Sequence, residues 1–170
     1  TATKIFTILL SIFTAFTTLM LPRISQLVAQ NKIEDIKILI GKSYDALFMI
    51  GIPTLIVGAI LAPQIVEIIA GKGYEGAILP MRIVMPLILI IGIAQILIIQ
   101  ILMPFNNDNF ILINSVIGAI VGVSLNVILV DLYSSVGSAL VLLLSEMSVV
   151  VSANYFVKKH IGFSIPYKKL

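Results

Sequence analysis

Cysteine is absent from this sequence, histidine occurs once, and only 11% of the residues are charged. Without cysteine the chain has no disulfide framework, no thiolate nucleophile and no Cys-based metal site. The one histidine, His160, lies in a basic tail, which excludes a multi-His metal centre and a Ser-His-Asp triad. No basic patch is interleaved with aromatics, so nucleic acid is not expected as a partner. We therefore predict no enzyme, no catalytic residue, no metal and no cofactor.

The scarcity of charge also excludes an ordinary soluble domain, in which about 25% of residues are charged. Apolar residues make up 59% of the chain and the mean hydropathy is +1.15. A bilayer core ~30 Å thick is crossed by about 20 apolar residues in a helix. The sequence thus predicts an all-α membrane protein, a bundle of about five transmembrane helices. The expected spans are residues 4–21, 44–70, 82–103, 110–130 and 136–157, followed by a basic tail over residues 158–170.

Between the first two expected spans, residues 23–43 carry six charged side chains and are predicted to interrupt the membrane region. Apolar residues recur there every three or four positions, which indicates an amphipathic helix at the membrane surface within a solvated loop. The second expected span contains Pro53 and Pro63, and a proline inside a helix removes one backbone hydrogen bond and bends it. A moving hinge and a static kink are equally compatible with these two prolines.

The last expected span carries one carboxylate, Glu146, near its middle. At 100° per residue, Glu146 shares a small and polar face with Ser145 and Ser152, and the opposite face, which could touch lipid, carries Leu143, Leu144, Met147 and Val150. An ionisable group in mid-membrane costs at least ~2.5 kcal/mol on insertion scales and is rarely kept without a use. Glu146 is either a transport or ion-coupling group or a neutral group bonded to a neighbouring helix.

Other polar residues in the expected spans extend this candidate lumen. In the first span, hydroxyls recur at helical spacing with Lys4 beside them: Thr3, Thr7, Ser11, Thr14 and Thr18. They line a cavity or pack against other helices, and Lys4 either contacts an anionic substrate or extends to the interface. Gln95 and Gln100 lie about 140° apart, so at most one should face a shared cavity. Asn126 adds an interhelical hydrogen-bonding group, on the same face as the close-packing pair Gly118 and Gly122.

The distribution of Lys and Arg predicts the orientation, because positively charged loops stay in the cytoplasm. Eight basic residues fall on one side of the expected spans and three on the other: Arg23, Lys32, Lys37, Lys42, Lys158, Lys159, Lys168 and Lys169 against Lys4, Lys72 and Arg82. The prediction is a multi-pass protein of the cytoplasmic membrane with a cytoplasmic C-terminus and Thr1 outside. The first residue is Thr and opens almost directly into an apolar run, so we expect the chain to be a piece of a longer membrane protein.

Several short motifs follow one another in a familiar order: Leu21-Pro22-Arg23-Ile24-Ser25, Gly51-Ile52-Pro53, Ala62-Pro63-Gln64-Ile65-Val66, Gly71-Lys72-Gly73-Tyr74, Val136-Gly137-Ser138-Ala139 and Ser145-Glu146. In this order and spacing the chain resembles the C-terminal half of bacterial and archaeal oligosaccharide flippases. These are the Wzx-type polysaccharide biosynthesis membrane proteins of the multidrug/oligosaccharidyl-lipid/polysaccharide exporter superfamily. Each motif is short and degenerate, and the resemblance covers nearly the whole chain.

The resemblance implies a transporter of two lobes related by an axis along the membrane normal, of which this chain supplies part of the second lobe. A cavity between the lobes would carry a polyprenyl-diphosphate-linked oligosaccharide across the membrane by alternating access, coupled to a proton or sodium ion. The implied partners are the lipid-linked oligosaccharide, the coupling ion, membrane lipids and the missing N-terminal lobe. Only Glu146, and more weakly Lys4, are proposed as essential charged groups from this half.

Alternative functions remain open at this point. A multidrug or cation exporter, or a flippase for the peptidoglycan precursor, belongs to the same superfamily. A membrane-embedded glycan-processing enzyme needs paired acid, base or nucleophilic groups, and none emerges from the spacing of this sequence. A non-transporting scaffold subunit would show small-residue packing faces without a mid-membrane carboxylate.

Overall fold

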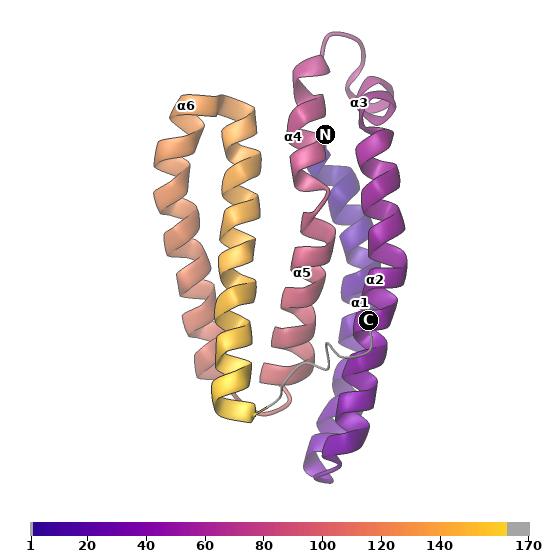
Figure 1. Ribbon diagram of the computed structural model, residues 1–170, viewed down its shortest axis with the longest axis vertical. Helices are drawn as coiled ribbons and strands as arrows, with labels where there is room; N and C mark the ends of the chain where they lie inside the picture. The colour runs from indigo at the N-terminus through magenta and orange to yellow at the C-terminus, as the bar shows by residue number, and fades with distance from the viewer. Residues whose placement is uncertain (1, 163–170) are drawn as a thin grey trace.

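The computed structural model describes residues 2–162, and for residues 2–10 and Ile12 only their backbone. This part of the chain consists of helices joined by short turns and contains no strand, which confirms the predicted all-α class. The elements follow in the order α1 (Ala2–Ala29), α2 (Ile33–Ile60), α3 (Ala62–Ala70), the 3₁₀ turn η1 (Glu75–Ala77), α4 (Ile78–Val84), α5 (Leu87–Gln95), the π-helix η2 (Ile96–Leu102), α6 (Asp108–Phe156) and the π-helix η3 (Val157–Ile161). They form a bundle of long, roughly antiparallel rods (Figure 1).

Three helical segments of the described chain are long and apolar enough to cross a membrane: Ile33–Ile60, Glu75–Leu102 and Asp108–Ile161. The third has 54 residues, which at 1.5 Å per residue is far more than one crossing requires. It folds back on itself at Ser134, whose φ of 49° and ψ of −117° are not helical. Figure 1 shows the two antiparallel arms of α6 joined at the upper end of the bundle. We call residues 108–133 the first arm and residues 135–156 the second arm.

The predicted polar interruption over residues 23–43 differs from the structure. Helix α1 continues through Pro22 to Ala29 and α2 starts at Ile33, so only residues 30–32 separate them. The reason is apolar contact: Leu27 and Val28 of α1 pack in the same cluster as Ile36 of α2. The charges of this region therefore lie on the exposed sides of a helical hairpin, where Lys37 also forms an ion pair with Glu34 at 2.8 Å.

The predicted span over residues 44–70 is also divided. Helix α2 ends at Ile60, and Pro63 lies in the first turn of α3, where a missing backbone N–H costs nothing. Pro53 remains inside α2, as the sequence predicts. The Arg82 guanidinium of α4 donates through Nε to the Ala59 carbonyl at 3.2 Å and so satisfies one of the free carbonyls at the end of α2.

Glycines set the spacing between α2 and the α4–α5 segment. A Cβ added to Gly51 would lie 2.5 Å from Leu89 Cδ2, and one added to Gly92 would lie 2.3 Å from Leu47 Cδ1. Each of these leucines thus occupies the space that a side chain on the opposite helix would fill. This reciprocal contact brings the two backbones close together, which is how helices associate without a hydrophobic driving force in lipid.

The lower end of the bundle in Figure 1 combines three parts of the chain. The α1–α2 turn, the turn between η2 and α6, and the end of α6 with η3 meet there, and their apolar residues share one core cluster. Lys32 lies in the first of these turns and Lys158 and Lys159 lie in η3. The α3–α4 loop, with Lys72, lies at the opposite end (Figure 1).

Candidate functional site

The second arm of α6 presents one helical face to the first arm. Four pairs of residues define this contact from the bend to the lower end: Gly122 with Ser145, Gly118 with Val149, Asn114 with Ser152, and Phe110 with Phe156. Small residues dominate the contact, apart from the stacked Phe110 and Phe156 rings at 5.1 Å. The Ser152 hydroxyl donates to the Asn114 Oδ1, so a polar bond joins the two arms within the apolar region.

A second face of the same arm packs against α5 and η2. Leu143 contacts the cluster of Leu87 and Ile88, and Ala153 is fully buried in the main core, as is Val157 at the start of η3. Glu146 follows Leu143 by three residues and precedes Ala153 by seven, and this spacing places it on the same face of the helix. Its carboxylate is therefore directed to the bundle side and not outward, where Leu144 and Met147 are exposed.

Glu146 is half-buried, and it makes no hydrogen bond and no ion pair with the side chains that the structure describes, those of Ser11 and residues 13–162. A carboxylate in an apolar region without a partner is costly, and such groups commonly mark ion or substrate pathways. The alternative was a neutral Glu146 hydrogen-bonded to a neighbouring helix, and the described side chains form no such hydrogen bond. Glu146 is accordingly the leading candidate for a functional residue in this chain.

Gln95 has a different environment from the expected lumen. Its Nε2 donates to Thr14 Oγ1 at 2.8 Å, and its Oε1 accepts from Thr17 Oγ1 at 3.2 Å. Thr17 also donates to the Thr14 carbonyl at 2.9 Å. The Gln95 amide thus joins the end of α5 to two threonines of α1, and both its oxygen and its nitrogen have hydrogen-bond partners. In this conformation Gln95 connects two helices and does not face an open cavity.

The remaining predicted site residues are not brought together. Ser145 lies beside Gly122 and donates to the Leu142 carbonyl of its own helix at 3.0 Å. Asn126, on the first arm, is exposed, and so is Ser11 on α1. Lys4 and Thr7 belong to α1, but at these two positions the structure describes only the backbone, so the predictions for their side chains lie outside the described part. Among the side chains that the structure describes, no hydrogen bond joins Glu146, Gln95, Asn126 and Ser145 to one another.

Two buried polar residues were missed as site candidates by sequence reasoning. Gln100 in η2 and Asn114 in α6 both have an exposed fraction of 0%. Among the residues that the structure describes, both side-chain amide atoms of Gln100 lack a hydrogen-bond partner, and so does Nδ2 of Asn114. The only sequence signal was an amide inside an apolar run, and that signal did not distinguish Gln100 from Gln95.

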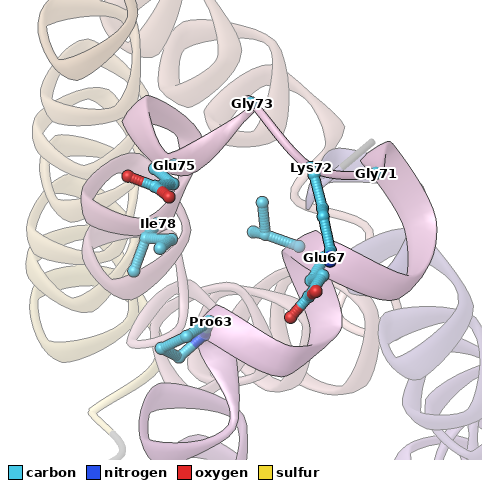
Figure 2. Close-up of a pocket in the computed structure, with 8 residues that line it drawn as sticks. Pro63, Glu67, Gly71, Lys72, Gly73, Glu75 and Ile78 are labelled. Carbon is cyan, nitrogen blue, oxygen red and sulfur yellow. The ribbon is translucent and has the colours of Figure 1, made fainter.

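A pocket of ≈ 330 Å³ lies at the end of the bundle where α3 leads into α4 (Figure 2). In Figure 2 the Lys72 side chain extends towards Glu67, and Glu75 stands across the opening. Its other lining residues are Pro63, Val66, Gly71, Gly73 and Ile78. The three charged side chains are exposed. Their interactions with a ligand would be screened by water and salt, which makes this pocket a weaker candidate than the buried groups.

Fold and site together define the class: an all-α membrane protein whose apolar helices enclose isolated polar groups. No family model and no solved structure matches the chain. The chain is 27% identical over 139 residues to the Escherichia coli (strain K12) protein named "Putative O-antigen transporter". The match covers 82% of this chain and 33% of that protein, so the chain spans about a third of the length of this relative. The similarity supports a polysaccharide-transporter-like membrane protein.

Proposed function

We propose that this chain is part of a transporter that moves a polyprenyl-diphosphate-linked oligosaccharide across the cytoplasmic membrane. The observation that carries the proposal is the similarity to the protein named "Putative O-antigen transporter", which extends over 82% of the chain. An all-helical apolar bundle with a single carboxylate on an inward face is compatible with such a transporter. The chain would supply part of one lobe, and another lobe would complete the cavity.

The proposal assigns the basic end of the bundle to the cytoplasm. Lys32, Lys158 and Lys159 lie at that end, whereas Lys72 lies at the other. Positively charged segments are retained on the cytoplasmic side during insertion. The end of η3 would then be cytoplasmic, and the pocket of Glu67, Lys72 and Glu75 would open on the outer side.

Within this mechanism Glu146 takes up a proton or a cation in one conformation and releases it in the other. Its position supports the assignment: it faces α5, it is half-buried, and it has no ionic partner among the side chains of Ser11 and residues 13–162. Alternating access needs a group whose ion affinity differs between two states. A carboxylate without a fixed partner meets this requirement because water, an ion or a second helix can each satisfy it in turn.

The experiment uses the protein expressed from its complete gene in a cell that lacks its own oligosaccharide flippase. Surface glycan is quantified for wild type, for Glu146→Gln, and for Asp131→Asn as a control with an exposed carboxylate on the same helix. We expect glycan with wild type and Asp131→Asn, and a loss of at least tenfold with Glu146→Gln at equal insertion. If Glu146→Gln restores surface glycan fully, Glu146 has no role in transport and only packs against its neighbours. Failure of wild type to restore glycan would contradict the flippase and favour a drug or cation exporter.

A further inference from the structure

The outward face of the second arm of α6 changes its chemical character between the middle of the bundle and the lower end. Leu144, Met147 and Val151 are exposed apolar residues that follow one another at intervals of three and four. Tyr155 continues this series four residues after Val151 and is exposed as well. These intervals keep all four side chains on one side of the helix. We call these four residues the outward row.

The outward row ends beside two lysines of η3. Lys159 Nζ donates to the Tyr155 hydroxyl at 3.2 Å and lies 5.4 Å from the centre of the Tyr155 ring. Lys158, one residue earlier, is exposed. The helical turn that carries both lysines is packed against the first arm, because His160 stacks on Phe110 with 4.1 Å between the ring centres. Two ammonium groups are therefore held next to an exposed tyrosine.

Among the described side chains, no acidic group neutralises these lysines. The sequence over residues 147–162 contains neither Asp nor Glu. Neither lysine forms an ion pair with the side chains of Ser11 and residues 13–162, and this includes Asp108 at the start of the first arm. The lower end of the outward row thus combines uncompensated positive charge with an apolar surface.

The outward row has the length of one bilayer leaflet. Leu144 and Tyr155 are eleven residues apart, which at 1.5 Å per residue is about 16 Å along the helix. Half of a hydrocarbon core ~30 Å thick is about 15 Å. Tyrosine is enriched at the boundary between hydrocarbon and headgroups, and lysines near helix ends extend to the headgroups. With Tyr155 at this boundary, Leu144 lies near the middle of the membrane.

We propose that the outward row binds one anionic phospholipid of the leaflet at the lower end of the bundle. The acyl chains lie along the apolar residues of the row, and the phosphate accepts hydrogen bonds from the Lys159 ammonium and the Tyr155 hydroxyl. The hydroxyl accepts from Lys159 and keeps its own proton to donate. Lysines near the membrane surface attract anionic lipids, so the uncompensated charge selects such a headgroup over a zwitterionic one. This site does not depend on which substrate the protein transports.

The test compares the lipids that contact the two arms of α6 in the full protein. The photoreactive residue p-benzoylphenylalanine replaces either Val151 or Val116, and the protein is reconstituted in phosphatidylcholine vesicles with phosphatidylglycerol as the minor lipid. Val116 is the control because it is exposed on the first arm near the depth of Val151. The bond between Asn114 and Ser152 sets this depth, and the first arm has Asp108 in place of a lysine at its lower end. After illumination, mass spectrometry gives the ratio of phosphatidylglycerol to phosphatidylcholine adducts.

We expect this ratio to be at least threefold higher at Val151 than at Val116. Lys159→Gln should lower the ratio at Val151 to the ratio at Val116, and Tyr155→Phe should lower it in part. Lys32→Gln removes the same charge from the α1–α2 turn at the same end and should leave the ratio unchanged. Equal ratios at the two positions, or no response to Lys159→Gln, would overturn the proposed site. Adducts with protein instead of lipid at Val151 would also overturn it, because another part of the full protein would then cover the outward row.

Discussion

The contact between the two arms of α6 discriminates between two glycines that the sequence presents as equivalent. A Cβ added to Gly118 would lie 2.6 Å from Val149 Cγ2, whereas one added to Gly122 would lie 3.6 Å from Ser145 Cβ. The first distance requires a neighbour to move, and the second is an ordinary van der Waals contact. Val149 cannot easily rotate away, because a β-branched side chain in a helix has one strongly preferred rotamer.

We therefore expect Gly118→Ala to destabilise the protein relative to Gly122→Ala. Overpacking of a close contact costs about 1–3 kcal/mol. Both variants gain the same helix propensity on replacing Gly with Ala, up to about 1 kcal/mol. Because Gly122→Ala gains this propensity without overpacking, it should be neutral or slightly stabilising. The gain cancels when the two variants are compared, so their difference measures the overpacking at Gly118. The difference of about 1–3 kcal/mol corresponds to roughly a 5- to 150-fold change in the unfolding equilibrium.

The assay is unfolding of the full chain in mixed micelles of increasing SDS fraction, followed by circular dichroism. The double variant Gly118→Ala with Val149→Ala completes a thermodynamic cycle, because removal of the two Val149 methyls relieves the overlap. The coupling free energy should be favourable by about 1–3 kcal/mol. Equal unfolding midpoints for Gly118→Ala and Gly122→Ala, or a coupling near zero, would show that the arms do not pack in this register.

Three further variants test local features. Ser134→Gly should raise the free energy of unfolding by up to about 1 kcal/mol, because φ of 49° and ψ of −117° favour glycine; a lower free energy of unfolding would contradict the bend. Gly137→Ala should lower the yield of folded protein in size-exclusion chromatography, because its Cβ would lie 2.0 Å from the Leu129 carbonyl oxygen; wild-type yield would refute that approach. Gln95→Leu should weaken the α1–α5 contact by about 0.6–1.7 kcal/mol, measured by SDS unfolding, since it removes the bond to Thr14; an unchanged midpoint would argue against this connection.

The sequence alone was sufficient for the class of protein and for the position of Glu146. Long apolar segments in a bilayer must satisfy their backbone internally, so length and composition are enough to predict membrane helices. The 100° periodicity was enough to separate the face with Glu146 from the exposed face with Leu144 and Met147. It assigned Leu143 and Val150 to the lipid side, however, and both pack against the core.

Only the tertiary structure decided which polar groups have partners. Gln95 and Gln100 look alike in the sequence, but Gln95 bonds to Thr14, 81 residues away, while Gln100 has no partner among the described residues. Such pairing depends on which helices become neighbours and on the π winding after Gln95, and neither is encoded in local periodicity. The same holds for the α1–α2 hairpin, where apolar contacts between the helices keep a charge-rich stretch helical. Composition and helical periodicity determine which segments form membrane helices and which of their faces is polar. Contacts between segments distant in the sequence determine which polar residues have hydrogen-bond partners.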